Sequence, residues 1–223
     1  MRSIYSFLIV IELFLCTLAL SAPIQNDWIL QKKEAGIEVY TRKAPGSDFK
    51  EFKGIMYING ARLSSLVAAF DDTSSYTRWM HNCIEAKLIK KTSIFERYTY
   101  FVLHAGWPAV DRDNIAYSVI TQDRKSLSVT ITIIGKPDYM PQHNSRVRIP
   151  VMNTIWLFQP SESGPVKIIY QSDSVPGGNL PAGLANLAVV DIPYYTLLNL
   201  RNIIKEERYA KASYPEIQEP HER

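Results

Sequence analysis

Apolar and polar residues alternate along much of the chain between residues 31 and 175. In residues 127–133, leucine, valine or isoleucine occupies every second position, and serine or threonine stands between them. Such alternation places one face of a strand on a core and the other in water, as antiparallel sheets do. In residues 84–88 the same pattern predicts that Ile84 and Leu88 face the core.

Short connections join most of these strands and predict a meander. The strands are expected at residues 31–42, 49–59, 84–88, 94–104, 115–121, 127–133, 147–158 and 166–175, with turns at 44–48, 123–126 and 161–164. The connection at 135–145 is too long for a tight turn, and loops of this size often border a binding mouth. Pro150 interrupts one of the strands and predicts an edge position or a β-bulge there.

A helical period replaces the alternation in two places. In residues 61–80, apolar residues recur at helical spacing, and an Asp-Asp-Thr run at 71–73 predicts a break between two short helices. The second helical region begins near Pro181 and is expected to run to about residue 211, with a kink at Pro193. Residues 211–223 contain two prolines and terminal charges, and they are expected to form a disordered tail.

The second helical region is apolar on most of its circumference between residues 184 and 200. A helix of this kind must bury more than one face. One face can lie on the sheet, and the other face needs something apolar to cover. A hydrophobic ligand beneath the helix is one candidate.

The first 21 residues have the pattern of a secretory signal peptide. A basic start is followed by a mostly apolar run at 4–20 and by small residues at 21 and 22. Glu12 interrupts the run and argues against a permanent membrane span, although an uncleaved anchor is the alternative. We expect cleavage after Ser21 and export of the protein, either to a periplasm or to the outside of the cell.

Charge and cysteine content narrow the class of protein. The chain has 25 Lys plus Arg against 22 Asp plus Glu, which gives a net charge of +3. This balance argues against a nucleic-acid groove, which needs a clustered basic excess, and permits weak attraction to an anionic lipid surface. After cleavage Cys83 is the one remaining cysteine, so no intrachain disulfide can form. The remaining chain of about 200 residues is expected to form one domain held by its core.

No motif in the sequence indicates metal or nucleophilic chemistry. The histidines are His81, His104, His143 and His221, and no H-x-x-x-H pair occurs, so a metal site is not expected. The sequence also has no G-x-S-x-G turn and no Gly-rich phosphate loop. We expect Cys83 to be a small core residue. His104 is expected to be a hydrogen-bonded structural residue, with a position in the interior as the alternative.

Charged residues interrupt two otherwise apolar strand rows. Arg146 and Arg148 precede the row that contains Trp156, and Asp173 stands in the last predicted strand. An arginine that points into a cavity must be paired, because an isolated buried charge is very unfavourable. An inward pair of arginine and aspartate could anchor the polar end of a ligand. The alternative is that these charges face solvent at the strand ends.

Two separated motifs carry a family resemblance. A W-P-x-x-x-R-D run begins at Trp107 and ends at Asp113, and a Pro-Gly-Gly-Asn-Leu-Pro run at 176–181 leads into the final helix. Both resemble motifs of the START family, the lipid-transfer domains related to the steroidogenic acute regulatory protein. The resemblance covers about residues 26–210.

The resemblance implies an α+β helix-grip fold of the START and Bet v1-like type. In such a fold, a curved antiparallel sheet grips a long C-terminal helix around a hydrophobic cavity. The resemblance also implies noncovalent binding and transfer of a sterol, a phospholipid or a fatty acyl ligand in an internal tunnel, without a cofactor. Expected partners are this lipid and, transiently, a membrane surface, and the protein is expected to be a monomer that binds no nucleic acid.

The tunnel is expected to be lined by aromatic, apolar and polar side chains from the strands and the final helix. The expected lipid-binding residues are Tyr100, His104, Tyr117, Arg146, Arg148, Trp156, Asp173, Leu184, Leu187, Tyr195 and Leu198. No residue is expected to be catalytic or to bind a metal. The alternative is a cyclase- or hydrolase-like enzyme that uses His104, Asp173 or an arginine on a hydrophobic substrate in the same cavity.

Overall fold

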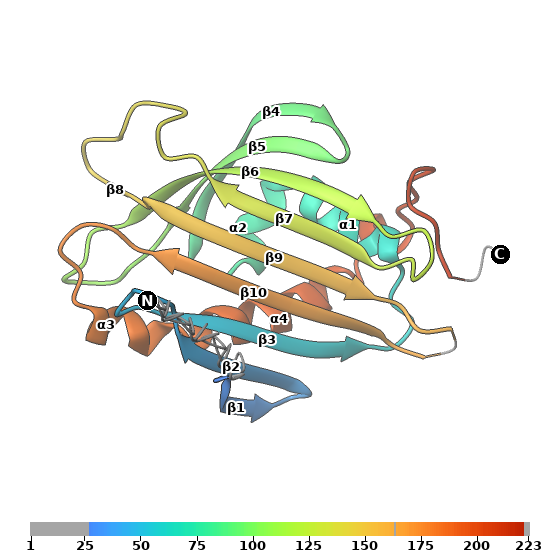
Figure 1. Ribbon diagram of the computed structural model, residues 1–223. Coiled ribbons are helices and arrows are strands. Elements are labelled where there is room, and N and C mark those ends of the chain that lie inside the picture. Colours follow the sequence, from blue (N-terminus) through green and yellow to red (C-terminus); the bar gives the residue numbers. More distant parts are fainter. Residues whose placement is uncertain (1–26, 163, 221–223) are drawn as a thin grey trace, which may run out of the picture.

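A largely antiparallel sheet forms one layer of the protein, and helices cover its concave side (Figure 1). The computed structural model describes residues 27–162 and 164–220. The strands are β1 (Ile29–Glu34), β2 (Ile37–Lys43), β3 (Lys50–Ile58), β4 (Cys83–Ser93), β5 (Glu96–Leu103), β6 (Arg112–Gln122), β7 (Val129–Gly135), β8 (Val147–Arg148), β9 (Val151–Gln159) and β10 (Val166–Val175). The helices are α1 (Leu63–Asp71), the short 3₁₀ helix η1 (Thr73–Ser75), α2 (Tyr76–Trp79), α3 (Ala182–Ala188), α4 (Asp191–Ile203) and α5 (Glu207–Ala210).

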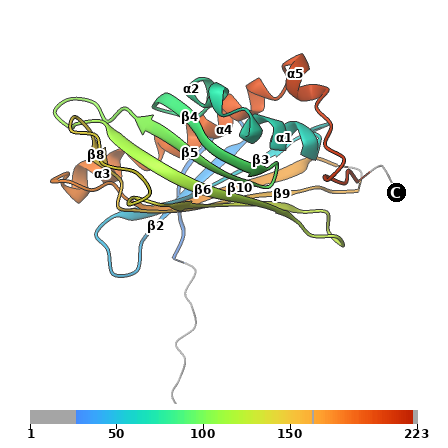
Figure 2. The same ribbon diagram turned by 90° about the horizontal axis from the view of Figure 1, so that it is seen from above.

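The strand order pairs β3, from the N-terminal part of the chain, with the last strand, β10. Across the sheet the order is β1-β2-β3-β10-β9-β7-β6-β5-β4, and β8 pairs with β6 outside this path. The pairings along the path are antiparallel, whereas β8 runs parallel to β6. Figure 2 shows the sheet curving so that α1, α2 and α4 lie on one side of it. The predicted α+β helix-grip fold is confirmed.

The hydrophobic core lies between the concave face and the helices. Alternate strand residues point inward, so that Met56 of β3 and Phe158 of β9 are fully buried. Phe70 of α1 packs edge-on against Trp79 of α2 and Trp156 of β9, with ring centroids 5.0 Å apart in each pair. These aromatic contacts join the short helices to the centre of the sheet.

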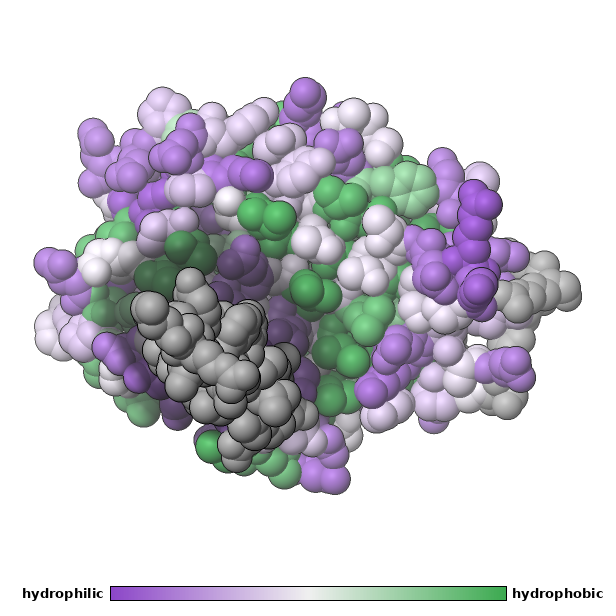
Figure 3. Space-filling model, viewed as in Figure 1, coloured by the Kyte–Doolittle hydropathy of each residue, from purple (hydrophilic) through white to green (hydrophobic). Residues whose placement is uncertain are grey.

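The outer face of the sheet carries an apolar stripe among polar residues (Figure 3). Ile55, Ile169 and Leu157 are half-buried neighbours on the adjacent strands β3, β10 and β9. Apolar cross-strand pairs of this kind stabilise a sheet. Apolar residues therefore occupy both faces of these central strands.

Helix α4 lies close to β3 because Gly54 has no side chain. A Cβ atom at Gly54 would lie 2.6 Å from Leu197 Cδ1 and 3.2 Å from Pro193 Cβ. Leu197 and Leu200 of α4 are fully buried on this side of the helix. The glycine thus lets the helix close the fold over the strands.

The C-terminal helical region contains three successive helices, although the sequence predicted one kinked helix. Helix α3 ends at Ala188, and α4 begins at Asp191. Pro193 explains the interruption, because proline has no N–H to donate and its ring clashes with the carbonyl group four residues earlier. The helix therefore breaks before the proline and resumes with Pro193 in its first turn.

The predicted strand at 31–42 is a hairpin of two strands, β1 and β2. Ala35 and Gly36 join the two strands, with positive φ angles of 49° and 74°. Two-residue hairpin turns need such angles, which glycine adopts readily and alanine rarely does. Because alanine is not a typical residue of such a turn, the sequence did not indicate a turn at this position.

Two further strands differ from the prediction. Ile84 and Leu88 of β4 are exposed, although their alternation predicted burial. Strand β4 is at the edge of the sheet, and three register shifts interrupt its pairing with β5, so the alternation does not hold one face inward. The predicted strand at 147–158 is divided at Pro150 into β8 and β9, because proline cannot donate to a sheet.

The C-terminal residues 211–220 pack on the domain, so the predicted disorder of this segment is wrong. Ile217 and Glu219 are buried. The Glu219 carboxylate accepts hydrogen bonds from the backbone N–H groups of Leu63 at 2.9 Å and Ser64 at 2.8 Å. These groups begin α1 and have no partner within the helix, so Glu219 caps α1 from the far end of the chain.

Other sequence predictions concern the ends of the chain and its cysteine. The predicted signal peptide at 1–21 lies outside the described residues, as do the last residues of the tail, 221–223. Within residues 27–162 and 164–220, no helix has the length and apolar character to cross a membrane. Cys83 is a buried free thiol, as predicted for a core residue.

Candidate functional site

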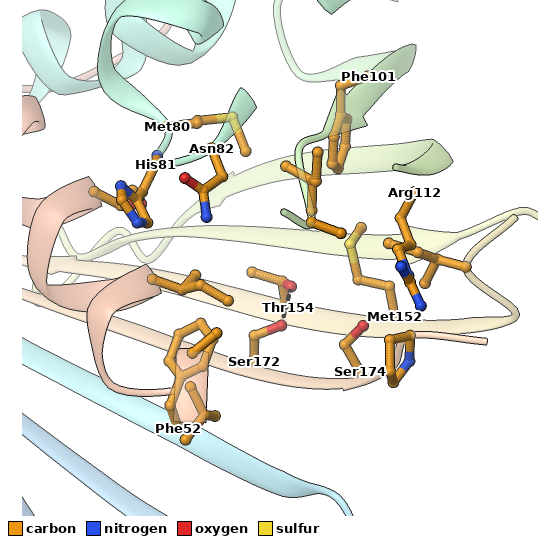
Figure 4. Close-up of a pocket in the computed structure, with 18 of the residues that line it drawn as sticks. Phe52, Met80, His81, Asn82, Phe101, Arg112, Met152, Thr154, Ser172 and Ser174 are labelled. Atoms are coloured by element: carbon orange, nitrogen blue, oxygen red, sulfur yellow. Dashed lines mark hydrogen bonds between the residues drawn. The ribbon is translucent and has the colours of Figure 1, made fainter. Parts of the chain in front are cut away.

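A cavity of about 410 Å³ lies between the concave face of the sheet and the helices (Figure 4). Its wall is mostly apolar and includes Phe52, Phe70, Phe101, Ile131, Met152, Trp156, Tyr170 and Ile192. Small-molecule sites are commonly apolar hollows of roughly 300–1,000 Å³ that contain a few polar groups. The size and the wall of this cavity therefore suit a hydrophobic ligand.

Aromatic side chains form the floor of the cavity. Trp156 stacks on Tyr170 with ring centroids 3.8 Å apart, and Phe52 meets Tyr170 edge-on at 4.8 Å. Burial raises the pKa of the Tyr170 hydroxyl above its usual value, so this group stays neutral in the physiological range. These floor residues offer apolar contact without charge.

Hydroxyl groups line the same side of the cavity. Thr154 and Ser172 are buried and hydrogen-bond to each other, with 2.7 Å between their oxygens. Ser174 continues the row and donates to the backbone carbonyl of Val151 at 3.2 Å. Each hydroxyl oxygen has two lone pairs, so the row can also accept hydrogen bonds from a ligand.

Arg97 lines the cavity, but protein groups bind its guanidinium. It donates to the backbone carbonyls of Phe70 and Ile94, each at 2.6 Å, and lies 2.9 Å from the Asp71 carboxylate. Its side chain is only 1% exposed. Arg97 therefore ties β5 to α1 and has little left to offer a ligand.

Arg112 lines the cavity at the start of β6, and its charge is not balanced in this way. The residue is 7% exposed and donates to the Val110 carbonyl. Within the described part of the chain, its Nε has no hydrogen-bond partner and its guanidinium forms no salt bridge. Burial lowers the pKa of Arg112 below its usual value, and the nearby Asp111 charge opposes this shift only in part.

His81 and Asn82 lie on the wall that the helices form, across the cavity from the hydroxyl row (Figure 4). The backbone N–H of His81 donates to Thr196 Oγ1 at 3.0 Å, which ties this wall to α4. The His81 ring stacks on Tyr195, with centroids 4.9 Å apart. Burial lowers the pKa of His81, so its imidazole is neutral at neutral pH.

Exposed apolar side chains surround the mouth of the cavity. Trp107 is 96% exposed and Leu184 of α3 is 51% exposed, and both line the cavity. His104 also lies on this rim, where its Nδ1 is 2.9 Å from the Asp111 carboxylate. The mouth is thus apolar and open to solvent.

Helix α3 covers the mouth with few anchors. None of its residues is buried. The Asn186 side chain accepts a hydrogen bond from the Lys50 N–H at 2.9 Å and donates to the Asp48 carbonyl at 3.1 Å. Gly177, with a φ of 71°, precedes the helix, and a Cβ atom there would lie 2.8 Å from the Arg148 carbonyl. The chain can therefore turn sharply from β10 into α3.

The structure places some predicted lipid-binding residues on the cavity wall and others outside it. His104, Trp156 and Leu184 are on the wall, and their role in binding stays a prediction. The residues outside it are Tyr100, Tyr117, Arg146, Arg148, Asp173, Leu187, Tyr195 and Leu198. Tyr195 reaches the wall indirectly, through its stacking on His81.

Most of the predicted strand residues that lie outside the wall point to the other face of the sheet. On β5 the inward residues include Thr99 and Phe101, so Tyr100 between them points outward. There the Tyr100 hydroxyl accepts a hydrogen bond from Arg146 at 2.6 Å, and Arg146 also binds Glu85 at 2.8 Å. Tyr117 and Asp173 are outward for the same reason.

Arg148 forms the predicted pair with an aspartate, but the aspartate is Asp113 and the pair lies outside the cavity. Arg148 Nε and Nη2 donate to the two Asp113 carboxylate oxygens at 2.9 and 3.0 Å. The guanidinium also donates to the backbone carbonyls of Pro137, Met140 and Pro141. The pair therefore fixes the loop between β7 and β8.

The sequence analysis missed the polar residues that do line the cavity. Thr154 stands two residues before Trp156, and Ser172 stands two residues after Tyr170, so strand alternation places each hydroxyl on the aromatic side. Arg112 was noted only as part of a motif. Among the residues that the structure describes, no group of three His, Cys, Asp or Glu side chains could hold a metal ion.

The sequence is similar to that of a known but uncharacterized protein. No family model matches the chain. It is 33% identical over 177 residues to an uncharacterized protein of Pseudomonas aeruginosa, a match that covers 79% of this chain and 86% of the relative.

Solved structures relate the fold to lipid transfer proteins. The match to human STARD10 has a TM-score of 0.71 at 19% identity and covers 83% of this chain and 76% of that chain. The match to human StAR-related lipid transfer protein 5 has a TM-score of 0.69 at 12% identity and covers 82% of this chain and 88% of that chain. These two show the fold alone. A STAR-related lipid transfer protein from Xanthomonas axonopodis has a TM-score of 0.75 at 31% identity, and the match covers 81% of this chain and 100% of that chain. A sequence relationship of this extent shows that the chain belongs to the StAR-related lipid transfer family.

Proposed function

We propose that this protein binds one lipid noncovalently in its cavity and transfers it between membranes outside the cytoplasm. The observation that carries the proposal is the apolar cavity of about 410 Å³, which opens at a rim of exposed apolar side chains. The family relationship supports the same function, because the Xanthomonas relative is described as a lipid transfer protein. The pattern of residues 1–21 supports the location.

Apolar burial alone can supply enough free energy for such binding. Each buried methylene group contributes about 0.8 kcal/mol, so ten of them give roughly 8 kcal/mol before the loss of translational and conformational freedom is subtracted. Polar groups such as Ser172 and Ser174 then need only to orient the head of the ligand. A carrier of this kind requires no catalytic group.

Release of the lipid requires the mouth to open, and α3 is suited to this motion. Its anchoring side chain, Asn186, makes two hydrogen bonds, and no residue of the helix is buried. Leu187 on the same helix is 75% exposed, and Trp107 of the rim is 96% exposed. We propose that this rim meets the membrane surface while the lipid enters or leaves.

The enzyme alternative names His104, Asp173 or an arginine, and of these His104 lies beside Asp111 at the rim. A carboxylate bound to one imidazole nitrogen orients the other nitrogen as a base, and this arrangement occurs in hydrolases. We propose that the pair is structural, since Asp111 also accepts a hydrogen bond from the Ala105 N–H at 3.2 Å and so holds the rim loop. Replacement of His104 by glutamine should then leave lipid binding intact, and loss of turnover without loss of binding would favour an enzyme.

The test of the proposed function is extraction of the purified mature protein followed by mass spectrometry of the lipids. A sterol, phospholipid or fatty acid should be recovered in about one copy per protein. Ser118→Phe, which fills the cavity, should reduce the recovered lipid severalfold. Val119→Phe, at the adjacent outward position, is the matched control and should keep it. Failure of the wild-type protein to retain or rebind any of these lipids would contradict the proposal.

A further inference from the structure

We propose that the bound lipid is anionic and that Arg112 binds its charged oxygen atoms, either the carboxylate of a fatty acid or the phosphate of a phospholipid. The inference rests on the proposed function, because it names the class of ligand for the same cavity. It depends on the unbalanced charge of Arg112, on the position of this residue in the cavity and on the groups that surround it.

The buried arginines of this protein differ in how their charges are compensated. Arg97 binds Asp71 and two backbone carbonyls, and Arg148 binds Asp113 and three backbone carbonyls. Arg112 is buried to nearly the same degree but binds the Val110 carbonyl, and its Nε has no partner in the described part of the chain. A buried cation is very unfavourable unless an anion or several hydrogen-bond acceptors compensate it.

The carboxylates nearest to Arg112 in the sequence are bound to other groups. Asp113 points to the other face of β6 and accepts two hydrogen bonds from Arg148. Asp111 binds His104 and the Ala105 N–H. Since these acids are occupied, an anion that balances Arg112 has to come from the cavity that the guanidinium lines.

The position of Arg112 fits the head of a lipid whose chain extends inward. Arg112 begins β6 directly after the rim loop that carries Trp107, and it lies on the cavity wall near Ser174 and Met152 (Figure 4). On β9, Trp156 of the aromatic floor stands four residues beyond Met152, about 13 Å further along the strand. A head group at Arg112 would therefore stay close to the mouth, with Ser174 as an additional hydrogen-bond partner.

A neutral lipid would not balance this site. A sterol hydroxyl can accept a hydrogen bond from the guanidinium, but it leaves the positive charge uncompensated. A carboxylate or a phosphate can accept two parallel hydrogen bonds from arginine and also neutralises its charge. This shared chemistry defines the class of ligand, and the experiment separates its two sources.

The test compares three single-chain probes that differ in their heads: oleate, oleoyl lysophosphatidate and oleyl alcohol. Their dissociation constants for the delipidated protein are measured by isothermal titration calorimetry. At least one of the two anionic probes should bind about 10-fold more tightly than the alcohol, as expected for a charged hydrogen bond in a buried site. A preference for oleate would identify a carboxylate as the ligand group, and a preference for lysophosphatidate would identify a phosphate.

Variants show whether Arg112 causes this preference. Arg112→Gln should weaken binding of the preferred anionic probe about 10- to 100-fold and should change binding of the alcohol less than about 3-fold. Arg112→Lys keeps the charge and should retain most of the preference. Arg146→Gln is the matched control, because it removes an arginine on the outer face of the sheet and should leave both constants unchanged.

A stability measurement separates a ligand-binding role from a structural one. The lipid-free Arg112→Gln protein should unfold at the same temperature as the wild type or at a higher one, because it no longer buries an uncompensated charge. A lower unfolding temperature together with equal losses for the alcohol and the anionic probes would show a structural role and overturn the inference. If Arg112→Gln does not fold, two measurements still test the inference. The wild-type protein should prefer an anionic probe over the alcohol, and Arg112→Lys should retain most of that preference.

The inference and the proposed function fail in different ways. If the wild-type protein binds the alcohol and both anionic probes with equal affinity, the inference about Arg112 is wrong while lipid binding stands. If it binds none of the three probes and retains no sterol or phospholipid, the proposed function is wrong.

Discussion

At the scale of single residues, charge compensation separates groups that hold the fold from groups that face the ligand. Arg148 and Asp113 are nearly inaccessible to solvent and bind each other through two hydrogen bonds. Arg148 also binds carbonyl groups of the loop between β7 and β8. This pair therefore belongs to the fold, although both residues are polar and lie near the cavity.

Replacement of Asp113 by alanine should lower the free energy of unfolding by about 3 kcal/mol, because it leaves the Arg148 charge buried without its partner. Denaturant unfolding measures this loss. Asp173→Ala, on the outer face of β10, is the control and should change the stability by less than about 0.5 kcal/mol. Combining Asp113→Leu with Arg148→Met should recover much of the loss, and a double variant as unstable as Asp113→Ala would contradict this explanation.

The Cys83 thiol should make stability depend on alkaline pH. Burial raises the pKa of Cys83 from 9.0 to about 11 in the folded protein. The unfolded thiol ionises at lower pH than the folded one, so its contribution is complete below pH 9 and is lost as the pH rises toward 11. The difference in unfolding free energy between the wild type and Cys83→Ala should therefore shrink by about 1 kcal/mol between pH 8 and pH 10. A difference that stays constant with pH would show that the folded thiol ionises normally.

The direction of individual side chains was the least predictable feature of the site. Alternation alone could not decide whether Tyr100 or Phe101 points into the cavity, because apolar residues occupy both faces of β5. Val102 is fully buried although it points away from the cavity. Which alternate set of side chains points into the cavity is decided by the pairing of the strands and by the segments that pack on each face of the sheet.

At the scale of elements, local sequence signals predicted most helices and strands, but contacts between distant segments changed several of them. The break at residues 71–73 gave two short helices, as predicted. Pro193 predicted a disturbance of the last helix but not its position. The tail at 211–220 lacks any regular pattern, and its order comes from contacts with α1, more than 150 positions away. Such contacts leave no periodic signal in the sequence.

Replacement of Glu219 by alanine should lower the free energy of unfolding by about 1–2 kcal/mol. The first turn of α1 would then lose the acceptor for the N–H groups of Leu63 and Ser64, which is comparable to the loss of a helix cap. Denaturant unfolding measures the change. Glu216→Ala, at an exposed position of the same segment, is the control. Equal stability of the two variants would show that the tail does not cap α1.

At the scale of the whole molecule, the sheet and the helices create a cavity whose mouth lies at one end of the sheet. The α+β class could be predicted because alternation, helical periodicity and two motifs all agreed. The cavity itself could not be derived from these patterns, since it depends on how far α3 and α4 stand from the floor. Helix α4 contacts β3 at Gly54, whereas α3 buries no residue, so the space opens toward α3.

This asymmetry predicts which end of the molecule meets a membrane. Trp107 is 96% exposed on the rim, and an exposed indole is expected to insert into a lipid interface. Trp107→Glu should therefore slow the transfer of a fluorescent lipid between vesicles about 10-fold. The amount of lipid bound by the purified protein should change little, because Trp107 borders the cavity only at its exposed rim.

Tyr57→Glu provides the matched control for this prediction. Tyr57 is also an exposed aromatic residue, but it lies at the end of β3 opposite to Lys50, where Asn186 anchors α3. The seven residue steps from Lys50 to Tyr57 span roughly 23 Å of strand, so Tyr57 is remote from the mouth. If membrane contact occurs through the rim, the Tyr57 variant transfers lipid at the wild-type rate. Equal slowing by both substitutions would indicate that their negative charge, rather than the place of the side chain, reduces attraction to the vesicles.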